Sequence, residues 1–273
     1  MALVRVIWLA VLTGVALVAA GAQASETVAT EKPAEEGWIL TLDANLSLEP
    51  DYPGASTSRV QKLPSFSFRR AGTPDDFSSP DDGLDFSVFD IDWLKAGPVA
   101  KLMGPRGKRS NPELKGLRPV DWTLEAGVFV EYWPMPWLRS RGELRQGLNG
   151  HEGLTGSLAL DAVARVGAFT FAAGPRLDLA NSQFMRRYFA VSAAEAAVNG
   201  RIAPFATHPG SYAMGMLASA AYTFSPAWTG TLWVQYQRLT GSAGNSPVAR
   251  TLGSRNQAST GITLSYSFGI KGF

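Results

Sequence analysis

The feature that most constrains this chain is a run of three consecutive segments, between residues 137 and 179, in which apolar and polar residues alternate. In the middle segment, Leu154–Val166, every even position is apolar or glycine, whereas Asp161 and Arg165 stand at odd positions. Successive side chains of a strand point to opposite faces, so each segment has one apolar and one mostly polar face. The segments also reach the roughly 9–11 residues that a tilted strand needs to cross a bilayer, against ~5–6 in an ordinary strand. The pattern therefore predicts a transmembrane β-barrel.

Eleven segments of the chain read as strands, whereas a barrel with both termini in the periplasm needs an even number. We therefore expect an all-β, antiparallel up-and-down barrel of about 12 strands, with 10 as the alternative. The miscount should lie within residues 58–98, because the alternation changes parity near residue 88, as at a β-bulge. The expected strands are Trp38–Leu48, Arg59–Arg69, Leu84–Leu94, Val99–Met103, Asp121–Trp133, Trp137–Gly147, Leu154–Val166, Phe169–Leu179, Tyr212–Phe224, Trp228–Leu239 and Gly261–Lys271.

Residues 1–24 read as a secretory signal peptide. Arg5 precedes the apolar stretch Val6–Val18, and Ala22-Gln23-Ala24 fits a small-x-small cleavage site, so we expect cleavage after Ala24. Residues 25–36 are acidic and poor in large apolar residues, which predicts a disordered periplasmic tail before a barrel at 37–273. This organisation predicts a protein of the outer membrane of a Gram-negative bacterium.

The composition of the chain excludes several kinds of functional site. The chain has no cysteine, which excludes disulfides, thiolate metal sites and cysteine nucleophiles. Without Arg5 the 25 Lys and Arg fall to 24, against 23 Asp and Glu, and this near balance is not that of a nucleic-acid-binding protein. We expect no cofactor and no nucleic-acid partner.

The connections between the expected strands fall into two classes. Three are short turns, at residues 134–136, 167–168 and 225–227, and three are long, at 105–120, 181–211 and 240–257. Barrels of this class keep short turns in the periplasm and long loops outside the cell. Aromatic residues gather beside the short turns, as in a girdle at a membrane interface. The expected periplasmic girdle is Tyr132, Trp133, Trp137, Tyr222, Phe224, Trp228, Tyr266 and Phe268.

Charged residues of three adjacent strands share the parity that should face the lumen. A charged lining could select anionic solutes. Alternatively, cross-strand ion pairs could fill the lumen, and a barrel of about a dozen strands is narrow enough for side chains to occlude it, which favours the second interpretation. The predicted lumen charge network is Arg139, Arg141, Glu143, Arg145, Asp161, Arg165, Arg176 and Asp178.

Two further motifs have both a chemical and a structural interpretation. His151-Glu152 could be a base with its orienting acid, but no serine motif or HExxH accompanies it, and a tight hairpin at Asn149-Gly150 is the favoured interpretation. Residues 71–83 contain Pro-Asp-Asp twice, and four carboxylates could hold Ca²⁺. The EF-hand spacing is absent, so two Pro-Asp turns on a solvated loop are favoured. We expect no catalytic or metal site.

A series of short motifs resembles the MipA/OmpV family of outer-membrane proteins, in which MipA is the MltA-interacting protein. No motif is specific alone, but their order and spacing cover nearly the whole mature chain. They include Asp51-Tyr52-Pro53-Gly54-Ala55-Ser56, Leu63-Pro64, Gly97-Pro98, Leu114-Lys115-Gly116-Leu117, Glu125-Ala126-Gly127-Val128-Phe129, His151-Glu152-Gly153, Gly174-Pro175-Arg176, Tyr188-Phe189-Ala190-Val191, Arg238-Leu239 and Ser246-Pro247. The chain departs from the family pattern in the length of the 71–83 insert and in Ala190, where Gly is common.

The resemblance implies a non-enzymatic barrel. It implies a scaffold that links a murein lytic transglycosylase to a penicillin-binding synthase during peptidoglycan remodelling. A small anion-preferring porin, or a surface adhesin or osmotic-response barrel, are the alternatives. Membrane lipids are expected partners, and lipopolysaccharide phosphates could meet the basic residues of the outer loops, which include Arg106, Lys108, Arg109, Arg186 and Arg187.

Overall fold

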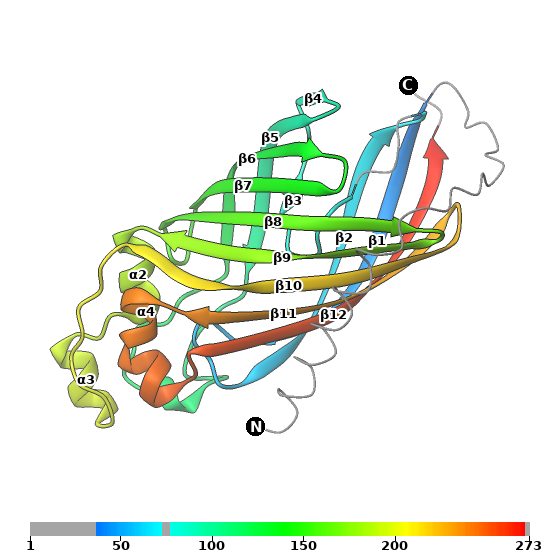
Figure 1. Ribbon diagram of the computed structural model, residues 1–273. Coiled ribbons are helices and arrows are strands. Elements are labelled where there is room, and N and C mark those ends of the chain that lie inside the picture. Colours follow the sequence, from blue (N-terminus) through cyan, green and yellow to red (C-terminus); the bar gives the residue numbers. More distant parts are fainter. Residues whose placement is uncertain (1–36, 73–76, 271–273) are drawn as a thin grey trace. The chain divides into compact units, whose positions relative to one another are not determined.

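The computed structural model of this chain describes residues 37–72 and 77–270. Within these residues twelve strands form a single antiparallel sheet that curls into a barrel (Figure 1). The predicted fold class, an antiparallel barrel of 12 strands, is thereby confirmed. The expected signal peptide at 1–24 and the expected tail at 25–36 lie outside the described residues.

Ten of the strands are long and follow one another around the wall, each antiparallel to the next, and β12 returns to pair with β1. They contain 10 to 16 residues. Two short strands, β3 and β4, lie along β5. The bounds are β1 Trp38–Pro50, β2 Ser58–Arg70, β3 Leu84–Asp85, β4 Phe89–Ile91, β5 Leu94–Met103, β6 Thr123–Met135, β7 Leu138–Gly147, β8 Leu154–Val166, β9 Phe169–Ala180, β10 Gly210–Ser225, β11 Trp228–Leu239 and β12 Asn256–Ile270.

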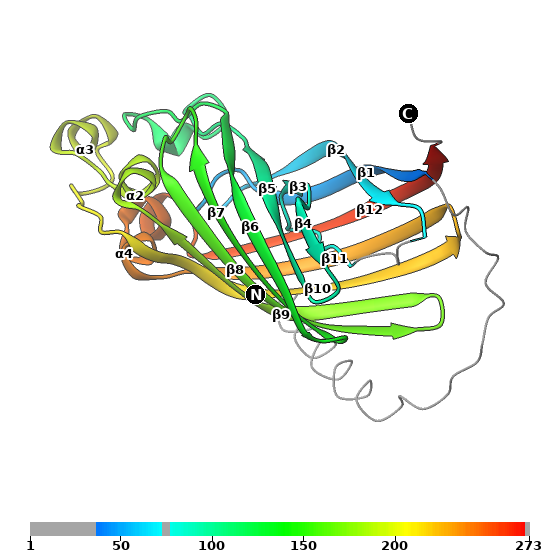
Figure 2. The ribbon, with the colours of Figure 1, turned by 90° about the horizontal axis from the view of Figure 1, so that it is seen from above.

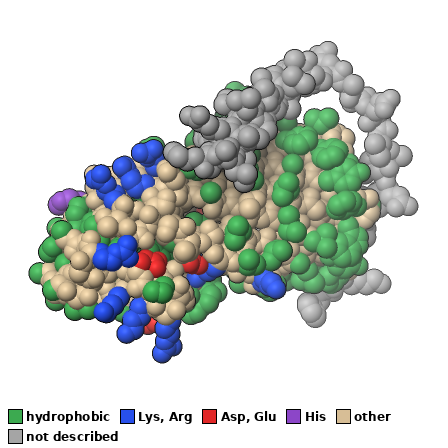
Figure 3. Space-filling view, turned by 90° about the horizontal axis from the view of Figure 1, so that it is seen from below, with side chains coloured by type: hydrophobic (Ala, Val, Ile, Leu, Met, Phe, Trp, Pro, Cys, Tyr) green, Lys and Arg blue, Asp and Glu red, His purple; other side chains and the backbone are tan. Residues whose placement is uncertain are grey.

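The alternation of side chains separates the inside of the wall from the outside. In β8, Leu158 and Leu160 face outward and are 52% and 41% exposed, whereas Thr155 and Asp161 face inward and are buried. Hydrophobic side chains cover much of the outer surface of the strands (Figure 3). Such a surface is unfavourable in water and favourable in hydrocarbon, and paired strands satisfy their own backbone groups there. The barrel is therefore built to span a membrane.

The two ends of the barrel differ. One end, the turn end, carries the short turns after β6, β8 and β10 together with the start of β1 and the end of β12. The other, the loop end, carries the three long connections, and the helices gather there (Figures 1 and 2). Within the described part of the chain, no helix combines the length and apolar character needed to cross a bilayer. The helices are η1 Pro112–Leu114, α2 Ser182–Phe189, α3 Ala193–Asn199, α4 Gly241–Asn245 and η2 Val248–Leu252.

The long connections fold into a compact apolar core, here called the loop-end core. Phe184, Met185, Tyr188 and Phe189 of α2 are almost completely buried in it. The strand ends and the other connections supply the remaining side chains. The further members are Tyr52, Ala55, Leu114, Val120, Ala180, Val191, Ala196, Ile202, Ala213, Leu239, Ala243, Val248, Ala249 and Leu252.

The sheet has two edge strands, β2 and β3, which do not pair with each other because they run in the same direction. The expected strand Leu84–Leu94 is broken into β3 and β4 where its alternation changes parity, and both halves run antiparallel to β5. They run from the middle of the wall toward the turn end, as does β2, so β2 and β3 cannot form an antiparallel pair. Among the described residues β2 pairs with β1 alone, which leaves a seam between β2 and β3.

Residues 71–83 were expected to form a solvated loop, but the part 77–83 of this connection between β2 and β3 lies in the lumen. The connection leaves β2 at the turn end, where the amide of Ala71 donates to the carbonyl of Gly37, and its residues 77–83 enter the lumen. Ser79 is buried there, with 3% of its surface exposed. A segment rich in Pro and Asp cannot face hydrocarbon as a strand, so its carboxylates turn toward the lumen. Residues 73–76, with two of the four candidate Ca²⁺ ligands, lie outside the described residues.

Candidate functional site

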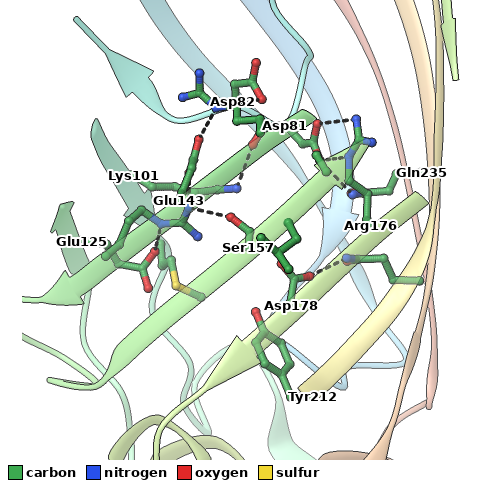
Figure 4. A pocket seen from close by; sticks show the side chains of 16 residues that line it. Asp81, Asp82, Lys101, Glu125, Glu143, Ser157, Arg176, Asp178, Tyr212 and Gln235 are labelled. Carbon is green, nitrogen blue, oxygen red and sulfur yellow. Dashed lines mark hydrogen bonds and ion pairs between the residues drawn. The ribbon is translucent and has the colours of Figure 1, made fainter. Parts of the chain in front are cut away.

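The lumen holds a dense network of charged side chains, which is the first candidate site (Figure 4). Strands β5 to β9 supply it from the wall, and residues 77–85 supply it from within the barrel. The strands place these side chains because every second residue of each points inward. The members, here called the lumen network, are Asp81, Asp82, Asp85, Lys101, Glu125, Glu131, Arg139, Arg141, Glu143, Arg145, Asp161 and Arg176.

Arg139 lies at the centre of the lumen network and is completely buried. Its Nη1 donates to Oδ2 of Asp161 at 3.0 Å, and its Nε donates to Oε2 of Glu131 at 2.9 Å. Its Nη2 donates to Oδ2 of Asp82 at 2.5 Å. Three carboxylates thus surround one guanidinium. The burial of such a charge is tolerable because every edge of the guanidinium has an acceptor.

Arg141 and Arg145 continue the network toward the loop end. Nη2 of Arg141 donates to Asp85 at 2.5 Å, and its Nε donates to Glu143 at 2.8 Å. Arg145 pairs with Glu143 and donates from Nε to Glu125 at 2.9 Å. Glu143 therefore bridges two arginines, whereas Asp85 and Glu125 each join their own strand to β7. The ion pairs connect neighbouring strands β6, β7 and β8 across the inner face of the wall.

The segment 77–83 is held in the lumen by charged contacts with the wall. Asp81 accepts from Nε of Arg176 at 2.7 Å, and Ser79 accepts from Nη2 of the same arginine at 2.9 Å. The ring of Phe77 lies edge-on to Trp133, at 6.4 Å between centroids. Trp133, which was expected in the girdle, also donates to Glu131 and so belongs to the lumen side of the wall.

Two predicted members differ from the rest. Arg165 is exposed near the turn end, and among the described residues no ion pair of this side chain is found. Asp178 lies in the lumen and accepts from Nε2 of Gln237 at 2.5 Å, a hydrogen bond drawn in Figure 4. The alternation assigned the face of each side chain, but it could not assign the partner.

The charge of the lumen does not suit an anion-selective pore. Counting the described side chains of the lumen network and Asp178, eight carboxylates face five Lys and Arg. The four arginines are engaged by these carboxylates and Lys101 donates to the main-chain carbonyl of Asp81, so they are not available to a passing anion. This balance removes the physical support for the anion preference that the arginine row suggested.

A cavity of about 160 Å³ remains beside the network. Asp178, Tyr212, Ser157 and Lys101 line it, together with carboxylates and arginines of the network (Figure 4). A space of this size holds a handful of water molecules rather than a solute path. The part of the lumen beside β5 to β9 is thus occupied by side chains of the lumen network and by residues 77–83.

His151 is buried and has a different partner from the one its sequence neighbour suggested. Its Nε2 lies 3.1 Å from Oε1 of Glu125, and its Nδ1 accepts from the amide of Gly153 at 2.9 Å. Because Nδ1 is an acceptor, Nε2 carries the proton and donates to Glu125. Both ring nitrogens are therefore occupied. The adjacent Glu152 is exposed and has a positive φ of 52°, in the tight turn expected at Asn149-Gly150.

The other expected girdle residues lie near the turn end. Trp137 and Phe224 are 52% and 63% exposed, and Tyr132, Tyr222, Trp228 and Tyr266 are exposed as well. The rings of Trp228 and Tyr266 meet at 4.7 Å between centroids, and Tyr266 stacks on Phe268. Their role at a membrane interface stays a prediction.

A second candidate site at the loop end was not foreseen, and it corrects the expectation that Arg106 is an exposed basic residue. Arg106 is 3% exposed. Its Nη1 donates to the carbonyl of Tyr188, and its Nη2 donates to the carbonyls of Arg118 and Arg187 at 2.9 and 2.8 Å. Its guanidinium also lies over the ring of Tyr52. No sequence signal distinguished this arginine from its exposed neighbours Lys108 and Arg109.

Burial and hydrogen bonding shift the pKa values of several groups at the loop end, among them Tyr188 and Glu195. Burial raises the pKa of Tyr188 to about 12, so this phenol stays neutral in the core. Partial burial opposes ionisation of Glu195, but hydrogen bonds from the backbone and side chain of Ser192 hold its pKa below the usual value. Ser192 and Glu195 form a capping box at the start of α3.

Comparison with known proteins gives a family for this chain. A family model described as MltA-interacting protein MipA matches residues 44–268. No curated protein matches the chain. Among solved structures, an outer membrane channel from Pseudomonas putida F1 is similar over 89% of this chain and 100% of its own, with 12% identity and a TM-score of 0.44. The corresponding values are 88%, 90%, 12% and 0.36 for the CymD monoaromatic hydrocarbon channel, and 85%, 100%, 9% and 0.37 for LpxR from Salmonella typhimurium.

Proposed function

This chain belongs to the MltA-interacting protein MipA family, and from that premise we propose that it is a closed interaction barrel. In this proposal it binds a murein lytic transglycosylase and a penicillin-binding synthase, and so joins the cleavage of peptidoglycan to its synthesis. The chain is an outer-membrane barrel. The description of the family names an interaction with MltA, and this carries the choice of partner.

The extent of the match supports the proposal. It covers residues 44–268, which include all the long strands except the first residues of β1 and the last of β12. The lumen network and the loop-end core both lie within it. The likeness to the family is therefore one of the whole barrel rather than of one motif.

The filled lumen supports an interaction role over a conduit. A porin needs a continuous aqueous path, whereas here Asp81 and Asp82 of the inserted segment bind arginines of the wall. The engaged His151 supports a non-enzymatic role, because neither ring nitrogen is free to take a proton from a substrate. A small porin is the second candidate, and it is favoured by the polar lumen-facing side chains of β1, such as Asp43 and Asn45, which are only half-buried.

The partner surface should be on the periplasmic side, since peptidoglycan enzymes work there. In this proposal the turn end and the N-terminal segment Ser25–Glu35 face the periplasm, as the lengths of the connections predict. Trp137 and Phe224 offer exposed aromatic side chains at the turn end. Ser25–Glu35 is an acidic segment that can order on a partner.

An affinity pull-down from solubilised cell envelopes tests the proposal. The tagged full-length protein should recover a lytic transglycosylase and a penicillin-binding synthase, and deletion of residues 25–35 should lower the yield of both. Lys115→Ala, at the exposed loop end, is the matched control and should leave the yield unchanged. If the intact protein recovers neither enzyme, the scaffold proposal is wrong.

The orientation is tested separately with single cysteines, because the chain has none of its own. A membrane-impermeant thiol reagent applied to intact cells should label Lys108→Cys at the loop end and leave Ala227→Cys at the turn end unlabelled. The reverse pattern would place the long loops in the periplasm and remove the basis for locating the partner surface at the turn end.

A further inference from the structure

The charges of this chain are distributed unequally between its loop-end connections and the segment that leads from β2 to β5. The three long connections of the loop end, residues 104–122, 181–211 and 240–257, contain ten Lys and Arg and three Asp and Glu, and the two short ones, 51–57 and 148–153, add Asp51 and Glu152. Residues 71–93, by contrast, contain seven Asp and no Lys or Arg. The loop end is therefore strongly basic, although the whole chain is nearly neutral. An excess of this size in one place creates a local potential that attracts anions.

Seven of the ten cations in the three long connections are exposed, against one of their three acids, Asp121. Among the ten cations Arg106 is buried, Arg187 and Arg255 are half-buried, and seven are exposed. Of the three acids, Glu195 is engaged by Ser192 and lies 3.8 Å from Arg118, and Glu113 is half-buried. Figure 3 shows Lys and Arg side chains spread over this end, with few acidic ones between them. The exposed cations are Lys108, Arg109, Lys115, Arg118, Arg186, Arg201 and Arg250.

Part of this surface is held in a fixed arrangement. One nitrogen of Arg106, Nη2, donates to the carbonyls of both Arg118 and Arg187, so the two main chains lie side by side. Arg186 precedes Arg187 in the last turn of α2, whose Tyr188 and Phe189 are anchored in the loop-end core. The main chains of Arg118, Arg186 and Arg187 are therefore held on one support, from which Arg118 and Arg186 are exposed and Arg187 is half-buried. These three residues are here called the arginine triplet.

A fixed group of guanidinium ions suits one kind of ligand in particular. Arginine binds phosphate through two parallel hydrogen bonds, and several arginines on a rigid support lose little entropy on binding. Exposed apolar residues of the wall extend to the loop-end termini of the strands, as at Leu102 of β5 and Leu154 of β8. Helix α2, which contains Arg186 and Arg187, lies beside these strand termini (Figure 1). A ligand presented there is a phosphorylated lipid of the same leaflet.

We propose that the arginine triplet binds the phosphate groups of lipopolysaccharide. The glycolipid would surround the barrel with its acyl chains against the outer face of the strands and its phosphates on Arg118, Arg186 and Arg187. This inference adds a lipid ligand at the loop end to the proposed function and does not require that the barrel bind a murein enzyme.

The test compares glutamine and lysine replacements of the triplet in the full-length protein. R118Q/R186Q/R187Q removes three charges, R118K/R186K/R187K keeps them, and R165Q removes an exposed arginine at the turn end as the control. Each barrel is purified in detergent, its fold is checked by heat-dependent mobility on gels, and bound lipopolysaccharide is measured after washing. The triple glutamine variant should retain at least threefold less lipopolysaccharide than the wild type, R165Q should match the wild type, and the lysine variant should lie between them.

Three outcomes would overturn the proposal. Equal retention by the folded triple glutamine variant would show that the triplet does not bind the glycolipid. Equal binding of purified lipopolysaccharide before and after enzymatic removal of its phosphates would show that phosphate is not recognised. Complete competition by inorganic phosphate at the concentration of the lipid phosphates would indicate a site for free phosphate instead of a glycolipid.

Discussion

Arg106 donates a hydrogen bond from Nη1 to the main-chain carbonyl of Tyr188, at 2.6 Å, near the C-terminal end of α2. The last carbonyls of a helix have no partner within the helix and carry partial negative charge, so a buried guanidinium fits there. The same side chain holds the connection 104–122 through the carbonyl of Arg118. One buried cation therefore joins two connections that are far apart in sequence.

Replacing Arg106 should loosen the loop end without unfolding the barrel. Arg106→Met removes the charged donor from three main-chain carbonyls, of which that of Tyr188 is buried and those of Arg118 and Arg187 are partly buried. At about 1.5–3 kcal/mol for a hydrogen bond to a charged group, we expect the loop end to lose at least about 3 kcal/mol. Limited proteolysis should cut within 181–211 much faster than in the wild type. Arg109→Met, at an exposed position, should be cut at the wild-type rate, and equal rates for both variants would contradict the role of Arg106.

Removing Asp161 should destabilise the barrel wall. Asp161 and Arg139 are both completely buried, and Oδ1 of Asp161 also lies 2.8 Å from Nη2 of Arg176, an ion pair by distance whose angles are poor for a hydrogen bond. Asp161→Ala leaves two buried arginines short of an acceptor, which should cost about 3–5 kcal/mol. Urea unfolding of the barrel in vesicles measures this cost. Arg165→Ala is the control on the same strand, and a wild-type midpoint for Asp161→Ala would show that the residue is solvated.

Acid should melt α3 before the rest of the loop end. The pKa of Glu195 is lower in the folded chain than in the unfolded chain, so its stabilising effect is present above the unfolded pKa and is lost as the pH falls through the folded pKa. Hydrogen exchange of the α3 amides should therefore accelerate as the pH falls below about 4, after correction for the intrinsic rate. Glu195→Gln keeps a capping side chain but cannot titrate, and its α3 should lose this pH dependence. An unchanged dependence in Glu195→Gln would assign the effect to another group.

Neighbouring residues of the segment 77–83 should differ in their accessibility to a water-soluble reagent. Ser78 is exposed, whereas Ser79 is buried against Arg176. In the folded barrel a water-soluble thiol reagent should react readily with Ser78→Cys and much more slowly with Ser79→Cys, and the two rates should converge in denaturant. Similar rates in the folded barrel would mean that residues 77–83 spend much of their time outside the lumen.

The strands were largely predictable because one physical constraint governs every residue of a membrane wall. Leu154–Val166 and Trp228–Leu239 have the predicted bounds, since lipid on one side and a polar lumen on the other leave a strict alternation. Strand β5 begins at Leu94, five residues before the predicted start at Val99, and so includes Gly97 and Pro98. The strand tolerates Pro98 beside the broken strand β3–β4, where its carbonyl accepts from the amide of Phe86.

The helices and the inserted segment were harder to predict. The Ser192-x-x-Glu195 capping box was a readable signal for α3, and Asn181 caps α2 by accepting from the amides of Gln183 and Phe184. The connection 181–211 nevertheless lacks the long periodicity that marks a helix. The path of residues 77–83 depends on pairs such as Asp82 with Arg139, which are 57 residues apart. Alternation reports the face of a residue and contains no information on such partners.

The central claim is that this barrel is closed by its own side chains and acts through its surfaces. Conductance of the purified wild-type protein in a planar lipid bilayer tests this claim most directly. Because Asp81, Asp82 and the arginines that bind them fill the lumen, we predict no ion current above that of the bare bilayer at moderate voltage. A steady, ohmic current in proportion to the amount of inserted protein would contradict the claim and would identify the chain as a porin.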